Sequence, residues 1–355
     1  MTLAIGLMSG TSIDGIDAAA LETDGVGVVM PHGALTLPYE PVLRERIRSV
    51  LGGRGDLVVV EAQLTEAHAR AVEMLISRYG LQGASLIGFH GHTVLHRPWE
   101  RRTWQIGDGA LLARLTGLDV VNDFRSADVA SGGQGAPFVP LFHRAMAAGL
   151  ERPLAIVNIG GVANVTWLGR NDDDILAFDT GPGNALLDDW ALRHLGRPVD
   201  DNGALARGGA VDERHVAVFL AHPFFAALPP KSLDRDDFAR FVPRHLSPAD
   251  GAATLAAMTV AGIAAARRHF PQPVARWLVT GGGRRNPVLM AMLAARLDAP
   301  VAAVETAGWD GDALEAQAFA YLAVRSVKGL PLSLPQTTGV AMPMTGGRLH
   351  RARGA

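Results

Sequence analysis

The sequence contains no cysteine, and its only lysines are Lys231 and Lys328. The lack of cysteine excludes disulfides, thiol nucleophiles and thiolate metal sites, and it makes the cytoplasm the simplest compartment. Because lysine is so rare, the positive charge that a phosphate group requires must come mainly from arginine, from backbone N–H groups or from a metal ion.

Strongly charged segments and long apolar segments are also missing. The formal net charge is -2, with 48% hydrophobic and 19% charged residues, which gives the chain no electrostatic reason to bind nucleic acid or a membrane. Residues Met1–Gly10 lack the charged start and the cleavage site of a signal peptide, so they indicate a mature N-terminal strand. The longest apolar run, Ala252–Ala266, is rich in alanine and too short to span a bilayer, and it predicts a core helix.

Three common enzyme motifs do not occur in the sequence. There is no GxxxxGK(S/T) loop, no GxGxxG after a strand and no GxSxG elbow. Their absence argues against P-loop NTPases, Rossmann dehydrogenases and α/β-hydrolases.

The length of the chain predicts two domains, because 355 residues exceed what one hydrophobic core usually serves. Each half begins with two apolar runs joined by a glycine-containing turn: Leu3–Met8 and Ile16–Leu21, then Leu154–Ile159 and Val165–Leu168. This pattern predicts a hairpin at the start of two related halves. We therefore expect domains at 1–150 and 151–355 around a cleft, and we allow for the last helix packing back on the first domain.

Helical and extended segments alternate along the rest of the chain. Helical patterns occupy 61–79, 108–116, the segment from Ala185, 248–266, 287–297 and 313–327, and runs typical of buried strands occupy 86–89, 118–121 and 274–280. Alternation of this kind predicts an α/β fold. The glycine-rich segment 123–140 predicts a functional loop or a connection between domains, and the tail from Leu330 predicts an irregular end.

The first segment that can carry chemistry is the turn of the first hairpin, Gly10–Asp17. Its glycines, hydroxyls and backbone N–H groups can approach an anion closely. The carboxylates of Asp14 and Asp17 are the hard oxygen ligands that Mg²⁺ prefers, so the loop could hold a magnesium nucleotide. A plain polar hairpin turn has the same composition and remains an alternative.

The second segment is Asp179–Asn184, which follows the apolar run Ile175–Phe178 and precedes a helix. A strand end holds a carboxylate rigidly, and glycines before a helix offer free N–H groups to an anion. Asp179 is therefore a candidate catalytic group, with a structural helix cap as the alternative. The Gly281–Gly283 turn could similarly lie flat against an adenine or ribose, or simply form a tight strand-to-helix crossover.

Histidines and one arginine form the last candidate group. His90 and His92 would share one face of a strand. With His96 they suggest either a zinc site or the polar lining of a sugar cleft. The lining is favoured, because no acidic or third ligand with convincing spacing accompanies them. Arg125 begins the long glycine-rich loop. It could form a fork onto a substrate carboxylate, or a structural salt bridge with Asp123 or Asp128.

Several motifs together resemble the anhydro-N-acetylmuramic acid kinase family in order and spacing. They are Gly6–Asp17 (GLMSGTSIDGID), Gly88–Thr93 (GFHGHT), Gln105–Asp108 (QIGD), Asn122–Arg125 (NDFR), Asn158–Asn164 (NIGGVAN) and Asp179–Asn184 (DTGPGN), with the match continuing to Glu315. The two hairpins alone would match many actin-like ATPases, whereas the first and last of these motifs together would not.

The resemblance implies the duplicated actin-like ATPase (ribonuclease H-like) fold, with ATP at the base of an interdomain cleft and the sugar above it. It implies hydrolytic opening of the 1,6-anhydro ring of 1,6-anhydro-N-acetylmuramic acid coupled to phosphorylation of O6, giving N-acetylmuramate 6-phosphate and ADP. It further implies a cytoplasmic homodimer that uses ATP and Mg²⁺ in the recycling of bacterial cell-wall fragments.

The resemblance also assigns residues. Asp179 is the general base, and Arg125, His92, Asp123 and Glu315 are expected at the sugar. The ATP site is expected to comprise Gly10, Thr11, Ser12, Ile13, Asp14, Gly15, Ile16, Asp17, Gly160, Gly161, Gly181, Gly183, Gly281, Gly282 and Gly283, with Asp14 holding Mg²⁺ directly or through water. A kinase for another sugar, a phosphoanhydride hydrolase and a nucleotide-regulated actin-like binding protein remain the rival hypotheses, because a fold does not fix a substrate.

Overall fold

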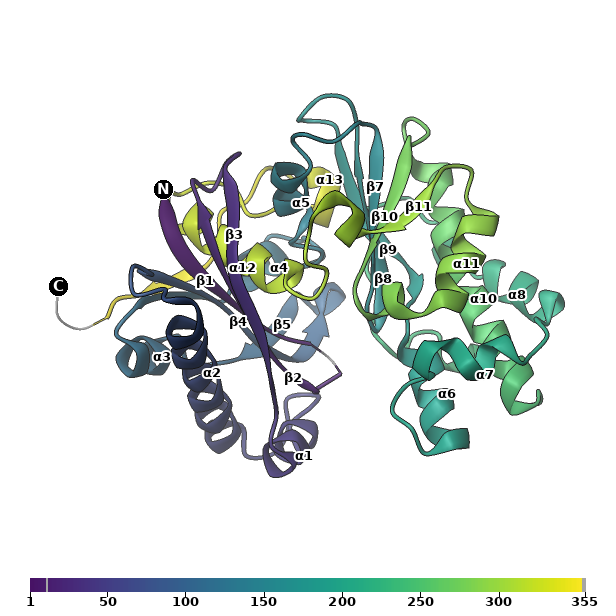
Figure 1. The fold of residues 1–355 in the computed structure, drawn as a ribbon, viewed down its shortest axis with the longest axis horizontal. Helices are drawn as coiled ribbons and strands as arrows, with labels where there is room; N and C mark the ends of the chain where they lie inside the picture. Colours follow the sequence, from purple (N-terminus) through teal and green to yellow (C-terminus); the bar gives the residue numbers. More distant parts are fainter. Residues whose placement is uncertain (11, 353–355) are drawn as a thin grey trace. The chain divides into compact units, whose positions relative to one another are not determined.

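The computed structural model describes residues 1–10 and 12–352 of the chain. The chain divides into two compact units, one formed by Met1–Gly149 with Ala313–Ala355 and the other by Leu150–Asp312. The first boundary lies where the sequence predicted it, near residue 150. The residues from Ala313 onward belong to the first unit, which is the return to the first domain that the prediction allowed for, so the second domain ends earlier than residue 355. Each unit is built around its own sheet (Figure 1).

The first unit contains a mixed sheet of seven strands. The strands are β1 Thr2–Ser9, β2 Gly15–Thr23, β3 Val29–Pro38, β4 Leu86–Arg97, β5 Arg102–Ile106, β6 Asp119–Asn122 and β12 Arg348–His350. Their order is β12-β6-β4-β1-β2-β3, and β5 pairs with β4. The helices are α1 Pro41–Ser49, α2 Leu57–Tyr79, α3 Gly109–Thr116, α4 Ser126–Ala130, α5 Pro140–Met146, α12 Leu314–Val327 and α13 Pro335–Thr338.

Helix α12 returns to the first unit because two glycines let it lie directly on the sheet. A Cβ atom at Gly6 of β1 would be 1.7 Å from the carbonyl oxygen of Ala316, and one at Gly88 of β4 would be 2.0 Å from that of Phe319. Any larger residue at these positions would therefore push the helix away from the strands. The contact fixes α12 to β1 and β4.

The second unit contains a five-stranded sheet with the order β11-β10-β7-β8-β9. Its strands are β7 Leu154–Ile159, β8 Val162–Leu168, β9 Ile175–Pro182, β10 Arg276–Thr280 and β11 Val301–Ala303. Its helices are α6 Ala185–Leu195, α7 Ala204–Arg207, α8 Glu213–Leu220, α9 Pro223–Ala226, α10 Pro248–Ala266 and α11 Pro287–Arg296.

The two sheets share one topology. In the first, β1, β2 and β3 are antiparallel neighbours, and β4 and then β6 continue the sheet in parallel with β1. In the second, β7, β8 and β9 are antiparallel neighbours, and β10 and then β11 continue it in parallel with β7. This repeat confirms the predicted α/β class and the duplicated fold.

Side-chain caps place the starts of α10 and α11 where the sequence predicts them. The Ser247 hydroxyl accepts a hydrogen bond from the backbone N–H of Asp250 at 3.2 Å, so α10 begins at Pro248. Asn286 accepts from the N–H groups of Val288 and Leu289 at the start of α11. Such caps satisfy donors that the first turn of a helix leaves unpaired.

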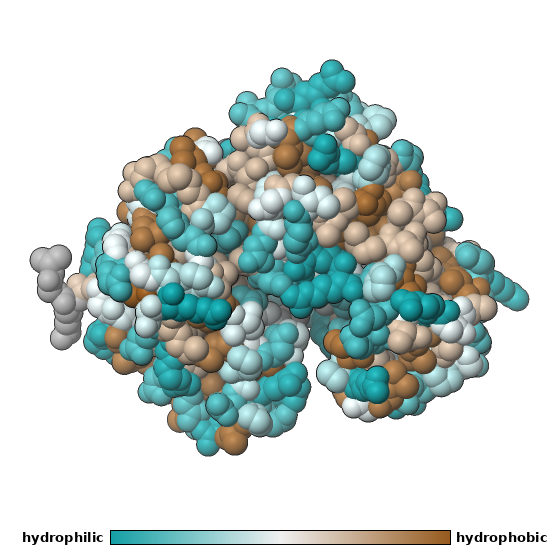
Figure 2. Space-filling model, viewed as in Figure 1, coloured by the Kyte–Doolittle hydropathy of each residue, from teal (hydrophilic) through white to brown (hydrophobic). Residues whose placement is uncertain are grey.

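Helix α10 and its continuation to His269 form the one helix of the described chain that is long and apolar enough to cross a membrane. The helix is longer than the apolar run on which the sequence prediction rested. However, 83% of its most apolar window is buried inside the protein. It is therefore a core helix, as predicted. The face of the molecule that Figure 2 shows carries hydrophilic and hydrophobic residues interspersed.

The tail and the long glycine-rich loop are more ordered than predicted, because one buried carboxylate joins them. Asp128 accepts hydrogen bonds from the Gly135 N–H at 2.7 Å and from the hydroxyls of Thr338, at 2.6 Å, and Ser333. Further along the tail, β12 pairs antiparallel with β6. The expectation of an irregular end was thus wrong for α13 and β12.

Candidate active site

The predicted phosphate loop is held by a buried side chain in its centre. Ile13 is 3% exposed and has a φ of 53°, in the left-handed region that β-branched residues rarely adopt. Its N–H donates to the Gly10 carbonyl at 3.1 Å. Because Ile13 turns inward, Ser12 and Asp14 on either side are exposed. Thr11, also predicted in this loop, lies outside the described residues.

The two aspartates of the loop differ in their surroundings. Asp14 is exposed and accepts a hydrogen bond from the Ser12 hydroxyl at 2.7 Å. Asp17, on β2, accepts from Thr36 at 2.6 Å. Both are hard oxygen donors, and the exposed Asp14 fits the magnesium ligand set, in which one or two carboxylates supplement water and phosphate oxygens.

A bulge in β4 separates two histidines that the sequence predicted on one face. Gly91 between them has a φ of 73°, and the pairing of β4 with β1 shifts at this point, so that Ser9 lies opposite His92. The His90 ring consequently packs against Phe319 of α12, at 4.6 Å between centroids, whereas His92 bonds to Ser9. The shared-face prediction was wrong, and no zinc cluster of His90, His92 and His96 occurs within the described part of the chain.

His92 forms the end of a buried hydrogen-bond chain. Tyr39, whose pKa is raised by burial and which therefore keeps its proton, donates to the Ser9 hydroxyl at 2.8 Å, and this hydroxyl bonds His92 Nδ1 at 3.0 Å. Burial lowers the pKa of His92 to about 4, so the ring is neutral at pH 7. Among the described residues its Nε2 has no hydrogen-bond partner.

Arg125 and Glu315 belong to one charged group of the first unit. Arg125 Nε donates to His90 Nε2 at 3.0 Å and Nη1 donates to the Gly135 carbonyl at 2.5 Å. Burial raises the pKa of Glu315, while Arg125 opposes this rise and Asp17 adds to it. Arg125 and Asp17 are therefore both close enough to Glu315 to influence its charge.

Asp123 is not part of this group. It is exposed, with a φ of 54°, and has no hydrogen bond or ion pair among the described residues. The salt-bridge alternative with Asp128 is also weakened, because the Asp128 carboxylate already accepts three hydrogen bonds.

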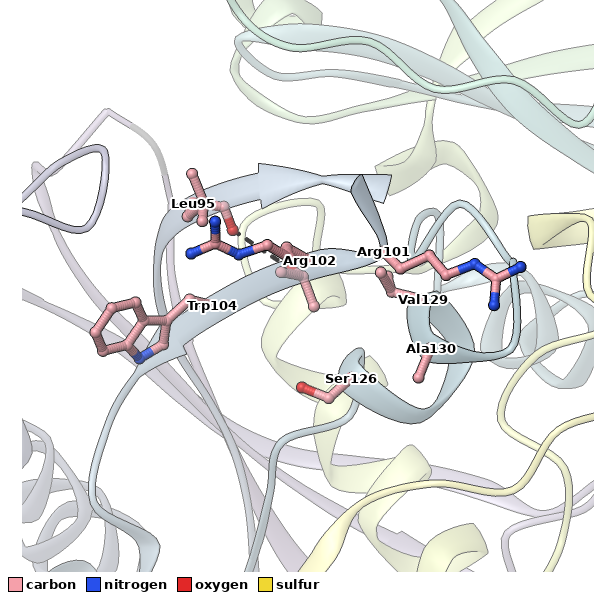
Figure 3. A pocket seen from close by; sticks show the side chains of 8 residues that line it. Leu95, Arg101, Arg102, Trp104, Ser126, Val129 and Ala130 are labelled. Atoms are coloured by element: carbon pink, nitrogen blue, oxygen red, sulfur yellow. Dashed lines mark hydrogen bonds between the residues drawn. The ribbon is translucent and has the colours of Figure 1, made fainter. Parts of the chain in front are cut away.

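A pocket of about 290 Å³ lies elsewhere in the first unit, between the β4–β5 hairpin and α4. It is lined by Leu95, Arg101, Arg102, Thr103, Trp104, Ser126, Val129 and Ala130 (Figure 3). Arg101 and Arg102 extend in opposite directions from the hairpin. None of the predicted site residues lines this pocket.

In the second unit, Asp179 is fixed on β9 by a neighbouring segment. Asp179 is only 6% exposed. The Leu233 N–H donates to Asp179 Oδ2 at 2.8 Å, and the Asp179 N–H donates to the Lys231 carbonyl at 3.0 Å. The segment is itself anchored, since Lys231 Nζ donates to the carbonyls of Phe224 and Ala227 at 2.8 and 3.0 Å. The carboxylate therefore has a defined orientation.

Two asparagines that the sequence analysis did not single out lie in register with Asp179. Asn158 on β7 faces Asn164 on β8, and Asn164 faces Asp179 on β9. Directly opposed residues share one face of a sheet, so the three form a polar row. Asn164 Oδ1 is buried and has no hydrogen-bond partner among the described residues. The motif NIGGVAN contained both asparagines, but only strand pairing reveals the row.

The Gly160–Gly161 turn joins β7 to β8 beside this row, and it corrects one prediction. The N–H groups of Gly183, Asn184 and Ala185, expected to be free for an anion, donate to the carbonyls of Gly160 and Gly161 at 2.7–3.2 Å. Gly183 must be small, because a Cβ there would be 2.2 Å from the Gly160 carbonyl oxygen. Within the described chain, the N–H groups of Gly160 and Gly161 themselves have no acceptor.

The three consecutive glycines differ in their surroundings. Gly281 has a φ of 75°, and a Cβ there would be 2.3 Å from Asn158 Oδ1. Gly283 packs on Ile159, whereas Gly282 is exposed and its Cβ would meet nothing closer than 3.6 Å. Gly181 is buried, with Phe225 3.5 Å from its Cβ position. Of Gly181 and the three consecutive glycines, Gly281 and Gly282 can therefore approach a ligand directly, whereas Gly181 and Gly283 are buried.

An ion-pair cluster holds the Gly281 turn in place. The Arg284 side chain is 6% exposed and contacts Glu305 at 2.7 Å and Asp312 at 2.9 Å. Its Nη1 donates to the Gly281 carbonyl at 3.0 Å. The rigid turn, the unpaired N–H groups of Gly160 and Gly161, and the row ending at Asp179 thus meet at one end of the second sheet.

Comparison with known proteins places the chain in a family. A family model described as anhydro-N-acetylmuramic acid kinase matches residues 2–352. A protein of that name from Paramagnetospirillum magneticum is 59% identical over 353 residues, covering 98% of this chain and 99% of its own, and one from Rhodospirillum rubrum is 55% identical over 349 residues, covering 97% and 93%.

Similarity to solved structures is much lower in sequence. A ROK family glucokinase from Streptomyces griseus in complex with glucose and AMPPNP is 15% identical, with a TM-score of 0.41, covering 90% of this chain and 99% of that chain. The family model and the close relatives span almost the whole length of the chain. The chain belongs to the anhydro-N-acetylmuramic acid kinase family.

Proposed function

We propose that this protein uses ATP to open the 1,6-anhydro ring of 1,6-anhydro-N-acetylmuramic acid and to phosphorylate O6, giving N-acetylmuramate 6-phosphate and ADP. Membership of the family supports the substrate and the reaction class. The observation that carries the mechanism is the Asp179 carboxylate, held by Leu233 N–H at 2.8 Å and aligned with Asn164. A buried carboxylate with a fixed orientation is well suited to act as a general base.

In the proposed reaction, Asp179 takes a proton from a water molecule as the water oxygen bonds to the anomeric carbon. The bond from this carbon to the bridging oxygen breaks, and the released O6 attacks the γ-phosphorus of ATP as the bond to ADP breaks. Leu233 N–H keeps one carboxylate oxygen in place. A fixed base lowers the barrier by holding the reacting atoms in a near-attack arrangement.

We propose that Asn164 orients a polar group of the sugar or the attacking water next to Asp179. Its Oδ1 is an acceptor without a partner inside the described protein. Leaving a buried acceptor unpaired costs about 1–3 kcal/mol, which a ligand donor would recover. The loss of this interaction should therefore weaken substrate binding without harming the unliganded fold.

The phosphates of ATP are proposed to bind Gly10–Asp17 and the Gly160–Gly161 turn, with Gly281 and Gly282 at the adenosine. The unpaired N–H groups of Gly160 and Gly161 support this assignment, since such groups bind anions. Gly181 and Gly183 are proposed to act by positioning the turn. Mg²⁺, held by Asp14 directly or through water, would neutralise charge on the phosphates.

At the sugar, we propose that Arg125 binds the lactyl carboxylate and that His92 and Glu315 contact hydroxyl or amide groups. Arg125 is oriented by His90 and Gly135, and His92 has an unpaired Nε2. Asp123 is proposed as a further sugar ligand, because it is exposed and lies two residues before Arg125 in the chain. The protein is further proposed to be cytoplasmic and a homodimer. Light scattering on the purified protein would test the dimer.

The experiment is ADP release in a coupled assay with Mg-ATP, with and without 1,6-anhydro-N-acetylmuramic acid, with glucose and N-acetylglucosamine as controls. We expect strong release only with the anhydrosugar. Release with another sugar would establish a kinase of different specificity. ATP turnover that is slow and independent of every sugar would instead favour a nucleotide-regulated binding protein and overturn the proposal.

A further inference from the structure

Three side chains of metal-binding type converge at a second place in the second unit. Asp212 is the N-cap of α8, His215 lies in the first turn of that helix, and His245 belongs to the turn before α10. Each of them offers an oxygen or nitrogen atom within 4.8 Å of those of the other two. None of the three belongs to the proposed active site.

The spacing of these atoms is close to that of ligands around one ion. Two ligands at 2.0–2.2 Å from a tetrahedral metal lie about 3.3–3.6 Å apart. His245 Nε2 and Asp212 Oδ2 are 3.7 Å apart, which is too long for a hydrogen bond. The rings of His215 and His245 have centroids 5.8 Å apart. The His245 side chain is exposed, so its ring can rotate toward the other two side chains.

Hydrogen bonds to the protein backbone orient two of the three side chains. Asp212 Oδ1 accepts from the His215 N–H at 3.0 Å, whereas Asp212 Oδ2 is the oxygen nearest His245. His215 Nε2 donates to the Phe241 carbonyl at 2.7 Å. Because a carbonyl can only accept, the proton of the neutral ring is on Nε2, and Nδ1 keeps its lone pair.

These contacts are the kind that orient metal ligands in known sites. A metal-binding histidine usually donates its second ring nitrogen to a carbonyl or carboxylate, which fixes the ring and its tautomer. The backbone of Asp212 is fixed as well, since its N–H donates to Thr254 of α10 at 3.0 Å. Two of the three ligands are therefore held in place before an ion arrives, and the third has an exposed side chain that leaves access from solvent.

We propose that Asp212, His215 and His245 form a surface site for a divalent transition-metal ion such as Zn²⁺, with water as the remaining ligand. Two imidazoles and one carboxylate favour zinc over magnesium, which prefers oxygen ligands. The ion would join the turn before α10 to the start of α8. This site is separate from the proposed kinase chemistry and needs no magnesium or nucleotide.

The test is a titration of the full chain, without a polyhistidine tag and after removal of metal by a chelator, with ZnCl₂ in a calorimeter. We expect one Zn²⁺ per chain, unaffected by an excess of Mg²⁺. His245→Ala should weaken the binding by at least about tenfold, the lower range seen when the environment of a metal ligand is lost. His245 is exposed, so this variant should fold normally.

His32→Ala provides a matched control. His32 is also a surface histidine beside a carboxylate, with its Nε2 3.6 Å from Glu22, but no third ligand accompanies it among the described residues. Its replacement should leave zinc binding unchanged. No binding to the unmodified chain at about 100 μM Zn²⁺, or equal binding by His245→Ala, would overturn the proposal. Kinase activity of the His245 variant reports separately on the proposed function, which this site does not require.

Discussion

Replacing Asp179 with asparagine should remove the general base while keeping its surroundings. In the unmodified protein, Leu233 N–H donates to Asp179 Oδ2 at 2.8 Å. The amide oxygen of the Asp179→Asn variant can still accept this hydrogen bond, and the side chain keeps its size. What is lost is the ability to take a proton. General-base catalysis typically contributes a factor of about 10² to 10⁴ in rate, which corresponds to roughly 3–5 kcal/mol in the barrier.

The assay compares ADP release in the presence of the anhydrosugar with ATP binding measured by calorimetry. We expect turnover to fall by at least about a hundredfold, while ATP binds with unchanged affinity. The control is Asp200→Asn, because Asp200 is equally buried, at 6% exposure, and accepts from the N–H groups of Leu205 and Ala206. That variant should lose stability but keep turnover.

Two outcomes would refute this reasoning. If Asp179→Asn retained turnover within about tenfold of the unmodified protein, the carboxylate could not be the base. If instead both variants lost ATP binding and thermal stability alike, the effect of Asp179 would be structural, and the contact with Leu233 would serve folding rather than proton transfer.

Three further predictions follow from the geometry. Asn164→Ala should raise the KM for the anhydrosugar by about tenfold while leaving or raising the Tm, because an unpaired acceptor is removed; a lowered Tm with unchanged KM would contradict this. Gly282→Ala should raise the KM for ATP and leave the Tm unchanged. Gly281→Ala should lower the free energy of unfolding by about 1–3 kcal/mol in denaturant titrations, because the φ of Gly281 is 75°. An equal loss of Tm in both variants would argue against a nucleotide role for Gly282. Burial lowers the pKa of His68 from 6.5 to about 4, so the unfolded state binds more protons than the folded state between these pH values. The free energy of unfolding should therefore fall by about 3 kcal/mol as the pH drops from 6.5 to 4. In His68→Phe, this dependence of the free energy of unfolding on pH should be weaker.

Local chemistry made much of the fold predictable from the sequence. Ser247 and Asn286 predict the starts of α10 and α11, because a side-chain acceptor followed by proline is a strong signal for the start of a helix. The two hairpins were found because each has a glycine turn between apolar runs. The hairpins are β1–β2 and β7–β8, whereas the third antiparallel strand of the first sheet, β3, was not predicted.

The features that escaped prediction depend on pairing between distant segments. The bulge at Gly91, which sends His90 and His92 to different neighbours, changes an alternation that the sequence alone suggests is regular. The N–H groups of residues 183–185 donate hydrogen bonds to the carbonyls of the Gly160–Gly161 turn, which precedes them in the chain. The unpaired oxygen of Asn164 is visible only once its two neighbouring strands are in register.

The glycine contacts of α12 have a consequence for the order in which the protein is made. Leu150–Asp312 is continuous, so the second unit has its whole sequence once residue 312 has left the ribosome. The first unit, although it begins at the N-terminus, lacks the helix that covers Gly6 and Gly88 until synthesis is almost finished. The first strands therefore stay uncovered until α12 has been made. A nascent or truncated chain that ends near residue 312 exposes one face of its first sheet to chaperones and proteases.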